Sequence, residues 1–268
     1  MSSTGTQPTS PGWYPDPAGG GRLRFHDGLG WTAQVSHGRP TKPLSQGFAH
    51  LGDWLSRLLA LNAGLCLLLA GYAVWGRALA SRVIVAPGLN LTVDPPQIPP
   101  DVQADLQTFL KVGFVLLVLS SLVGLLCGVL WLVWQYKLAV SAPTALRRSP
   151  GMHVASWIIP FVSYWFPFQN VSDLWRSYGT GRREEQAEAA PILLPLWWAS
   201  FVVVPFVSVL GGFLVGASLS PVAPEQMLPR LALVYAVVFA MLAGSALLAR
   251  QVVQRLSWRA LVHYAGDA

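Results

Sequence analysis

The sequence predicts an all-α integral membrane protein with four transmembrane helices, a re-entrant or interfacial helical segment, and a small N-terminal β-hairpin module. Composition is the first reason: hydrophobic residues make up 53% of the 268 residues and charged residues only 11%, whereas a soluble domain carries about 25% charge. The second reason is a series of apolar runs of ~20 residues, the length of a membrane-spanning helix. The third is a polar start rich in Pro, Gly and Ser, which lacks a signal-peptide pattern and is expected to stay in the cytoplasm.

The net charge of +6 has two explanations. Basic domains can bind nucleic acid, but Lys and Arg also collect in the cytoplasmic parts of membrane proteins. We favour the second explanation and expect no nucleic-acid partner. Cys66 and Cys127 both lie inside apolar runs, where a free Cys acts as a small packing residue. Two such residues predict neither a disulfide framework nor a zinc site, and we expect no metal or other cofactor.

The N-terminal module is expected over residues 11–35, between a disordered start at 1–10 and a linker at 36–50. Two short runs, 22–26 and 31–35, flank the turn-forming sequence Asp-Gly-Leu-Gly, which is a β-hairpin signal. The aromatic residues that can pack there are Trp13, Tyr14, Phe25 and Trp31. They could contact an extended or proline-rich peptide of a cytoplasmic partner. The alternative, which we favour, is that they only hold a very small core together.

This module resembles a known family in two segments. GWYPDP occupies residues 12–17, and RFHDGLGWT occupies residues 24–32. They resemble the actinobacterial domain of unknown function 2510, whose pattern is a GWYPDP segment followed by an R-[YF]-x-DG-x-x-WT segment. The resemblance implies a cytoplasmic accessory module and brings no known activity.

A helical membrane domain is expected over residues 51–264. Its predicted spans lie at about 55–77, 109–134, 192–217 and 230–249. Trp54 and Trp75 bracket the first span and are 21 residues apart, which corresponds to ~32 Å of helix and matches the hydrocarbon thickness of a bilayer. Small residues four positions apart occur at Gly124 and Gly128 and again at Gly212 and Gly216. Such faces let helices approach closely and would allow a homo-oligomer.

The central segment, residues 150–178, is apolar enough to enter a bilayer but is interrupted by prolines. If it enters and leaves on one side, only Arg77, Arg82, Lys111 and Arg230 lie outside, and 14 of the 18 Lys and Arg residues lie inside. If it crosses, the division is nine and nine. The positive-inside rule therefore favours a non-crossing segment and cytoplasmic termini in a bacterial plasma membrane. A fifth, kinked span is the alternative.

Local sequence in the central segment agrees with this topology. Ser149 can cap a helix that begins at Pro150, and Pro160 is expected to end it after about ten residues, half the thickness of a bilayer. Beyond Pro167, apolar residues recur at helical spacing and polar residues face the other way, as in a helix lying flat on the membrane surface. The residues expected to gather at this interface are His153, Trp157, Pro160, Pro167, Asp173, Trp175 and Arg176.

The same region carries a second resemblance. SPGM at 149–152, WIIP at 157–160, Pro167 and DLWRS at 173–177 resemble the actinobacterial membrane family called domain of unknown function 4328. The resemblance covers roughly residues 55–260, and members of this family are often preceded by a GWYPDP-type module. It implies a membrane location but no established activity, so no catalytic residue can be transferred.

The sequence offers little support for an enzyme. It has no Ser or Cys nucleophile motif, no HExxH spacing and no Gly-rich phosphate loop. His153, Asp173 and Arg176 could converge, but a structural pairing is the favoured interpretation. We therefore expect a non-enzymatic scaffold or regulatory protein that recruits a cytoplasmic partner through residues 11–35. The alternative is a passive channel or a protein that handles lipid or small solutes.

Overall fold

The computed structural model describes residues 11–17, 23–36, 44, 47–84, 98–179, 191–217 and 224–265. Contacts divide the chain into two units. One contains residues 1–49, 132–190 and 256–268, and the other contains residues 50–131 and 191–255. The stretch predicted to be disordered, 1–10, and most of the predicted linker, 36–50, lie outside the described residues.

The N-terminal module is a three-stranded antiparallel sheet with the strand order β1-β2-β3. Its strands are β1 (Pro11–Pro15), β2 (Leu23–Asp27) and β3 (Trp31–Ser36). The predicted hairpin is confirmed as β2 and β3, and β1 adds a strand that the sequence analysis did not predict. Asp27 Oδ1 accepts 2.8 Å hydrogen bonds from the N–H groups of Leu29 and Gly30. Gly28 has a φ of 94°, which favours glycine at this point of the turn.

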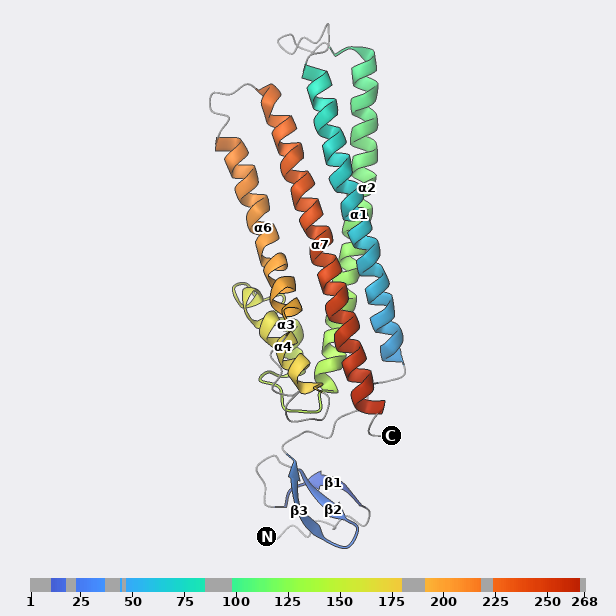
Figure 1. Ribbon diagram of the computed structural model, residues 1–268, viewed down its shortest axis with the longest axis vertical. Coiled ribbons are helices and arrows are strands. Elements are labelled where there is room, and N and C mark those ends of the chain that lie inside the picture. Colours follow the sequence, from blue (N-terminus) through green and yellow to red (C-terminus); the bar gives the residue numbers. More distant parts are fainter. Residues whose placement is uncertain are drawn as a thin grey trace. The chain divides into compact units, whose positions relative to one another are not determined.

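Four described helices are long and apolar enough to cross a membrane. They are α1 (Gly47–Ile84), α2 (Pro100–Val140), α6 (Leu193–Ala217) and α7 (Pro224–Ala265). The predicted mostly helical fold with four long apolar helices is confirmed (Figure 1). The first helix begins inside the segment predicted to be linker, and Phe48 in its first turn is fully buried. Large apolar residues such as Phe114 and Val209 stay exposed on these helices, as expected of surfaces that face lipid.

Within the second unit, contacts join the helices into a closed bundle. The Tyr72 ring of α1 stacks on the Phe109 ring of α2, with 4.8 Å between centroids. Trp131 of α2 contacts Trp197 of α6. The pairs that complete the bundle are Gly211 with Val234, between α6 and α7, and Arg250 Nε with Ser56 Oγ, between α7 and α1. Gly124 faces Asn62 of α1, whereas nothing lies near Gly128, Gly212 or Gly216 in the described residues.

The central segment folds into short helical pieces: α3 (Pro150–Ala155), the 3-10 helix η1 (Val162–Tyr164), and α4 (Phe166–Ser177). Pro150 is the first residue of α3, as predicted, and Ser149 occupies the N-cap position, but its side chain makes no capping hydrogen bond there. The helix ends at Ala155, before the predicted stop at Pro160, and the chain continues from there through hydrogen-bonded turns. The longest piece has 12 residues, or ~18 Å of helix, which is shorter than the ~30 Å hydrocarbon core.

Candidate functional site

Three aromatic rings of the β module form one cluster. The Tyr14, His26 and Trp31 rings meet edge to face, with centroids 5.1 to 6.4 Å apart. His26 is buried, while Tyr14 and Trp31 are half-buried. His26 Nδ1 also accepts a hydrogen bond from the Gly28 N–H group. Its role is therefore in the turn and in packing.

The single aromatic core predicted for the module is wrong in one respect. Phe25 precedes His26 in the same strand, and successive residues of a strand point to opposite faces. Phe25 is thus on the face opposite the Tyr14–His26–Trp31 cluster. It pairs in register with Trp13 of β1, whose side chain lies outside the described part of the chain. The structure therefore brings Tyr14 and Trp31 together on one face of the sheet, and it pairs Phe25 with Trp13 in the strand register.

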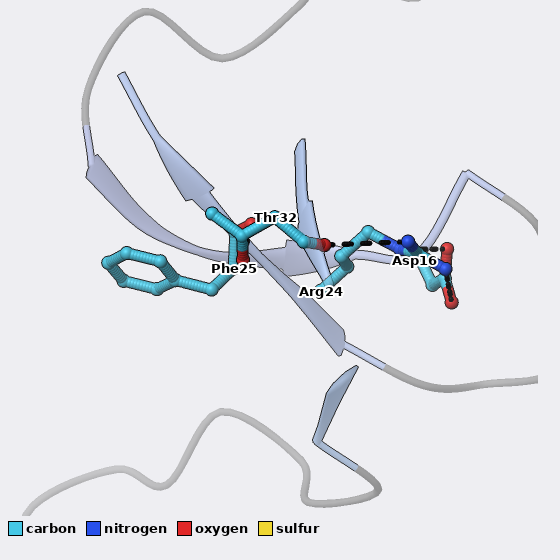
Figure 2. A network of polar contacts seen from close by, with 4 residues as sticks. All are labelled: Asp16, Arg24, Phe25 and Thr32. Carbon is cyan, nitrogen blue, oxygen red and sulfur yellow. Dashed lines mark hydrogen bonds and ion pairs between the residues drawn. The ribbon is translucent and has the colours of Figure 1, made fainter. Parts of the chain in front are cut away.

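A polar network that the sequence analysis missed fixes the start of the module (Figure 2). Arg24 Nε donates to Asp16 Oδ1 at 3.0 Å, and its Nη2 donates to Asp16 Oδ2 at 3.4 Å. The Asp16 side chain is only 1% exposed. Arg24 Nη1 reaches the Thr32 carbonyl oxygen, and Thr32 Oγ1 donates to the Phe25 carbonyl oxygen. These bonds give the Asp of the GWYPDP segment a structural role.

The helix α4 is buried on both its apolar and its polar sides. The predicted apolar face is confirmed, since its residues Val171, Leu174, Trp175 and Tyr178 are all buried. The predicted exposure of the polar face is wrong, because Asn170 and Asp173 are buried too. Only Arg176 of that face is exposed. The polar face does not lie against solvent because the preceding chain supplies partners for it.

Two adjacent arginines supply most of those partners. Arg147 Nε lies 3.2 Å from Asp173 Oδ1 in an ion pair. Arg148 donates to Asn170 Oδ1 at 3.1 Å and to Gln169 Oε1 at 2.5 Å. Its guanidinium also lies 3.6 Å from the centroid of the Phe166 ring, a favourable cation–π geometry. In the sequence, the signal for these contacts is the pair Arg147-Arg148, which directly precedes the proline-interrupted segment.

His153 and Asp173 do not form an acid–base pair. His153 is fully buried, and neither ring nitrogen has a hydrogen-bond partner in the described residues. Burial, with a smaller contribution from the nearby Arg148 charge, lowers the pKa of His153 to about 4. Burial raises the pKa of Asp173, and the arginine charges oppose this shift. At neutral pH His153 is therefore an uncharged, packed side chain.

The aromatic residues of the central segment tie it to the neighbouring helices. Trp157 Nε1 donates to Gln135 Oε1 of α2 at 2.8 Å. The Arg259 guanidinium of α7 lies 4.4 Å from the Trp175 ring centroid. Pro167 is buried in the first turn of α4, whereas Pro160 is exposed.

An apolar tip lies around Pro160. It consists of the exposed side chains of Ile158, Ile159, Phe161, Tyr164 and Trp165. Phe161 is 88% exposed and has a φ of 61°, a conformation that costs energy for a residue with a large side chain. The chain thus holds an aromatic ring outward in a strained turn.

Each of the two units contains a concave region. A polar pocket of about 320 Å³ is lined by Thr144, Ala145, Arg147, Asp173, Arg176 and Ser177. An almost wholly apolar groove of about 1030 Å³ lies between α1, α2 and α7. No group of three or more His, Cys, Asp and Glu able to hold a metal ion occurs among the residues that the structure describes.

Four long apolar helices and a short-helical segment define this chain as a multi-pass integral membrane protein. It belongs to the DUF4328 family, a domain of unknown function, whose sequence profile matches residues 94–257. Residues 11–44 match DUF2510, which is described as a protein of unknown function. Both resemblances found in the sequence are thereby confirmed. Searches of curated proteins and of solved structures found no match.

Proposed function

We propose that this chain is a non-enzymatic membrane scaffold that recruits a cytoplasmic protein through the module of residues 11–35. The observation that carries the proposal is the folded β module with half-buried Tyr14 and Trp31 rings beside a turn whose Leu29 side chain is 96% exposed. Half-buried aromatic rings near an exposed aliphatic side chain form a surface suited to an extended peptide. The central helices support a structural role, because the polar groups of α4 are largely engaged within the chain.

Photo-crosslinking in cells tests recruitment. A photoreactive amino acid placed at Leu29 is expected to trap a cytoplasmic protein, since that side chain makes no buried contact whose loss would unfold the module. The matched control carries the same group at Gln103, an exposed position of α2. An adduct pattern that is identical at the two positions would contradict recruitment by the module.

The proposed topology places both termini in the cytoplasm of a bacterial plasma membrane, with residues 150–178 entering and leaving on one side. The uneven distribution of Lys and Arg supports it, and so does the apolar tip around Phe161, which suits insertion into lipid. Cysteines introduced at the exposed positions Ala145 and Gln254 should resist an impermeant thiol reagent in intact cells. A cysteine at Gln103 should react. Labelling of Gln254→Cys would refute the cytoplasmic C-terminus.

The second candidate function is a passive channel or the handling of lipid or small apolar solutes. The apolar groove between α1, α2 and α7 favours the handling of apolar ligands, because sites for such ligands are concave and mainly hydrophobic. Ala232→Trp would fill part of the groove and should lower binding of a fluorescent fatty acid to the purified protein. Ala199→Trp, on α6 away from the groove, is the control. Equal binding by both variants would argue against this function.

A further inference from the structure

The polar pocket of about 320 Å³ is built from two stretches of one unit: the chain that leads from α2 toward α3, and the C-terminal half of α4. Thr144 and Ser177 join these stretches. Ser177 Oγ accepts a 3.2 Å hydrogen bond from the Thr144 N–H group and a 3.0 Å hydrogen bond from Thr144 Oγ1. The Arg147–Asp173 ion pair is a second connection. The pocket therefore has fixed walls.

The groups that line this pocket are mainly hydrogen-bond donors. Arg147 uses Nε for Asp173, so its two terminal nitrogens remain available. Arg176 is exposed and lines the pocket, where its positive charge acts on the Asp173 carboxylate. Ser177 is buried and already accepts two hydrogen bonds, which leaves its own hydroxyl proton to donate. Five donor positions on each guanidinium make arginine well suited to a multivalent acceptor.

The charge balance also favours an anion. Two guanidinium groups line the pocket against one carboxylate. Asp173 is 8% exposed; its Oδ1 is held by Arg147, and its Oδ2 is buried without a partner in the described residues. Burial raises the pKa of this carboxyl group, so its negative charge is stabilised less than that of an exposed aspartate. The lining thus has a net positive charge beside a buried, incompletely satisfied acid.

We infer that this pocket binds an oxyanion of the phosphate class, held by Arg147 and Arg176 with the Ser177 hydroxyl as a third donor. Phosphate has several acceptor oxygens, and paired arginines bind it through parallel, charge-assisted hydrogen bonds. A volume of about 320 Å³ is near the lower limit for ligand pockets, which fits a phosphate group or a small phosphate ester. Asp173 acts as a positioning residue, since it holds Arg147 at the pocket wall. This inference does not depend on recruitment by the β module.

The phosphate group can come from a phospholipid headgroup or from a free phosphorylated solute. Purified full-length protein is titrated in one arm with inorganic phosphate in detergent, with binding measured by thermal stabilisation. In a second arm it is placed in nanodiscs of phosphatidylcholine with or without phosphatidic acid. Stabilisation by phosphate in detergent identifies a site open to free solutes. Stabilisation only by phosphatidic acid identifies a lipid headgroup as the ligand.

The decisive variant is Arg176→Gln, because this side chain is exposed and its loss should not disturb folding. It should weaken binding about tenfold or more, as expected for a charge-assisted hydrogen-bonded contact. Ser177→Ala should weaken binding to a smaller degree. The matched control is Arg255→Gln, an exposed arginine of α7 outside the pocket with the same charge change.

Two results would overturn the inference. The first is the absence of stabilisation by either probe. The second is an equal loss of binding in Arg176→Gln and Arg255→Gln, which would indicate general electrostatic attraction.

Discussion

Acidification should destabilise this protein through one buried side chain, His153. The ring is fully buried, and neither nitrogen has a hydrogen-bond partner in the described residues. Burial and the neighbouring Arg148 lower its pKa from 6.5 to about 4. Replacing it with leucine, a residue of comparable size, removes the titrating group and two unsatisfied polar atoms. His153→Leu should therefore equal or exceed the parent protein in stability at neutral pH.

The size of the effect follows from the difference between the two pKa values. Above pH 6.5 the ring is neutral in both the folded and the unfolded chain, so it contributes no pH dependence. Between pH 6.5 and about 4 only the unfolded chain gains the proton, and folding free energy is lost as the pH falls. The full loss is about 3 kcal/mol, and about 2 kcal/mol of it is reached at pH 5. The raised pKa of Asp173 favours the folded state as the pH falls. This contribution is present in both the parent protein and His153→Leu, so it cancels when the two are compared.

Thermal unfolding in detergent at pH 7 and pH 5 measures this difference. The parent protein should lose roughly 5 °C more than His153→Leu between the two pH values. His50→Gln, a substitution at an exposed histidine of α1, should behave like the parent. An equal loss of melting temperature in the parent and in His153→Leu would refute the reasoning, because the buried ring would then not account for the pH dependence.

Three further substitutions test the packing. Gly211→Ala places a Cβ atom 2.7 Å from Val234 Cγ1. Because the valine side chain has few allowed rotamers, α6 and α7 must separate, and the protein should lose about 1–3 kcal/mol of stability, as measured by thermal unfolding. Gly212→Ala, with nothing within 4 Å in the described residues, should cost little. Asp16→Ala removes the partner of Arg24 and should destabilise the β module by about 1–3 kcal/mol. Limited proteolysis of the full chain should then cut faster within residues 11–36. The control Asp101→Ala should leave the rate of this cleavage unchanged. Trp134→Phe removes the 2.9 Å hydrogen bond to Ser257 Oγ and should lower the free energy of unfolding in denaturant by about 1 kcal/mol. An unchanged unfolding midpoint would show that this hydrogen bond adds no net stability.

Local sequence patterns determined much of the secondary structure of this protein and the buried face of one helix. Apolar runs of sufficient length indicated the four long helices, because each span must satisfy its own backbone hydrogen bonds in lipid. The Asp-Gly-Leu-Gly turn indicated the hairpin, since Asp27 and Gly28 supply the turn geometry from adjacent positions. The spacing of Val171 and Leu174 indicated the buried face of α4. Each of these features depends on residues that are close together in the sequence.

The tertiary structure alone decided which polar groups are buried and what they contact. Asp16 with Arg24, Arg147 with Asp173, and Thr144 with Ser177 are partners that no spacing rule connects. The polar face of α4 appeared suited to solvent, yet arginines from the preceding chain cover it. The physical reason is that a polar side chain can be buried only where a complementary group is placed beside it, and folding, not local sequence, decides which segments meet.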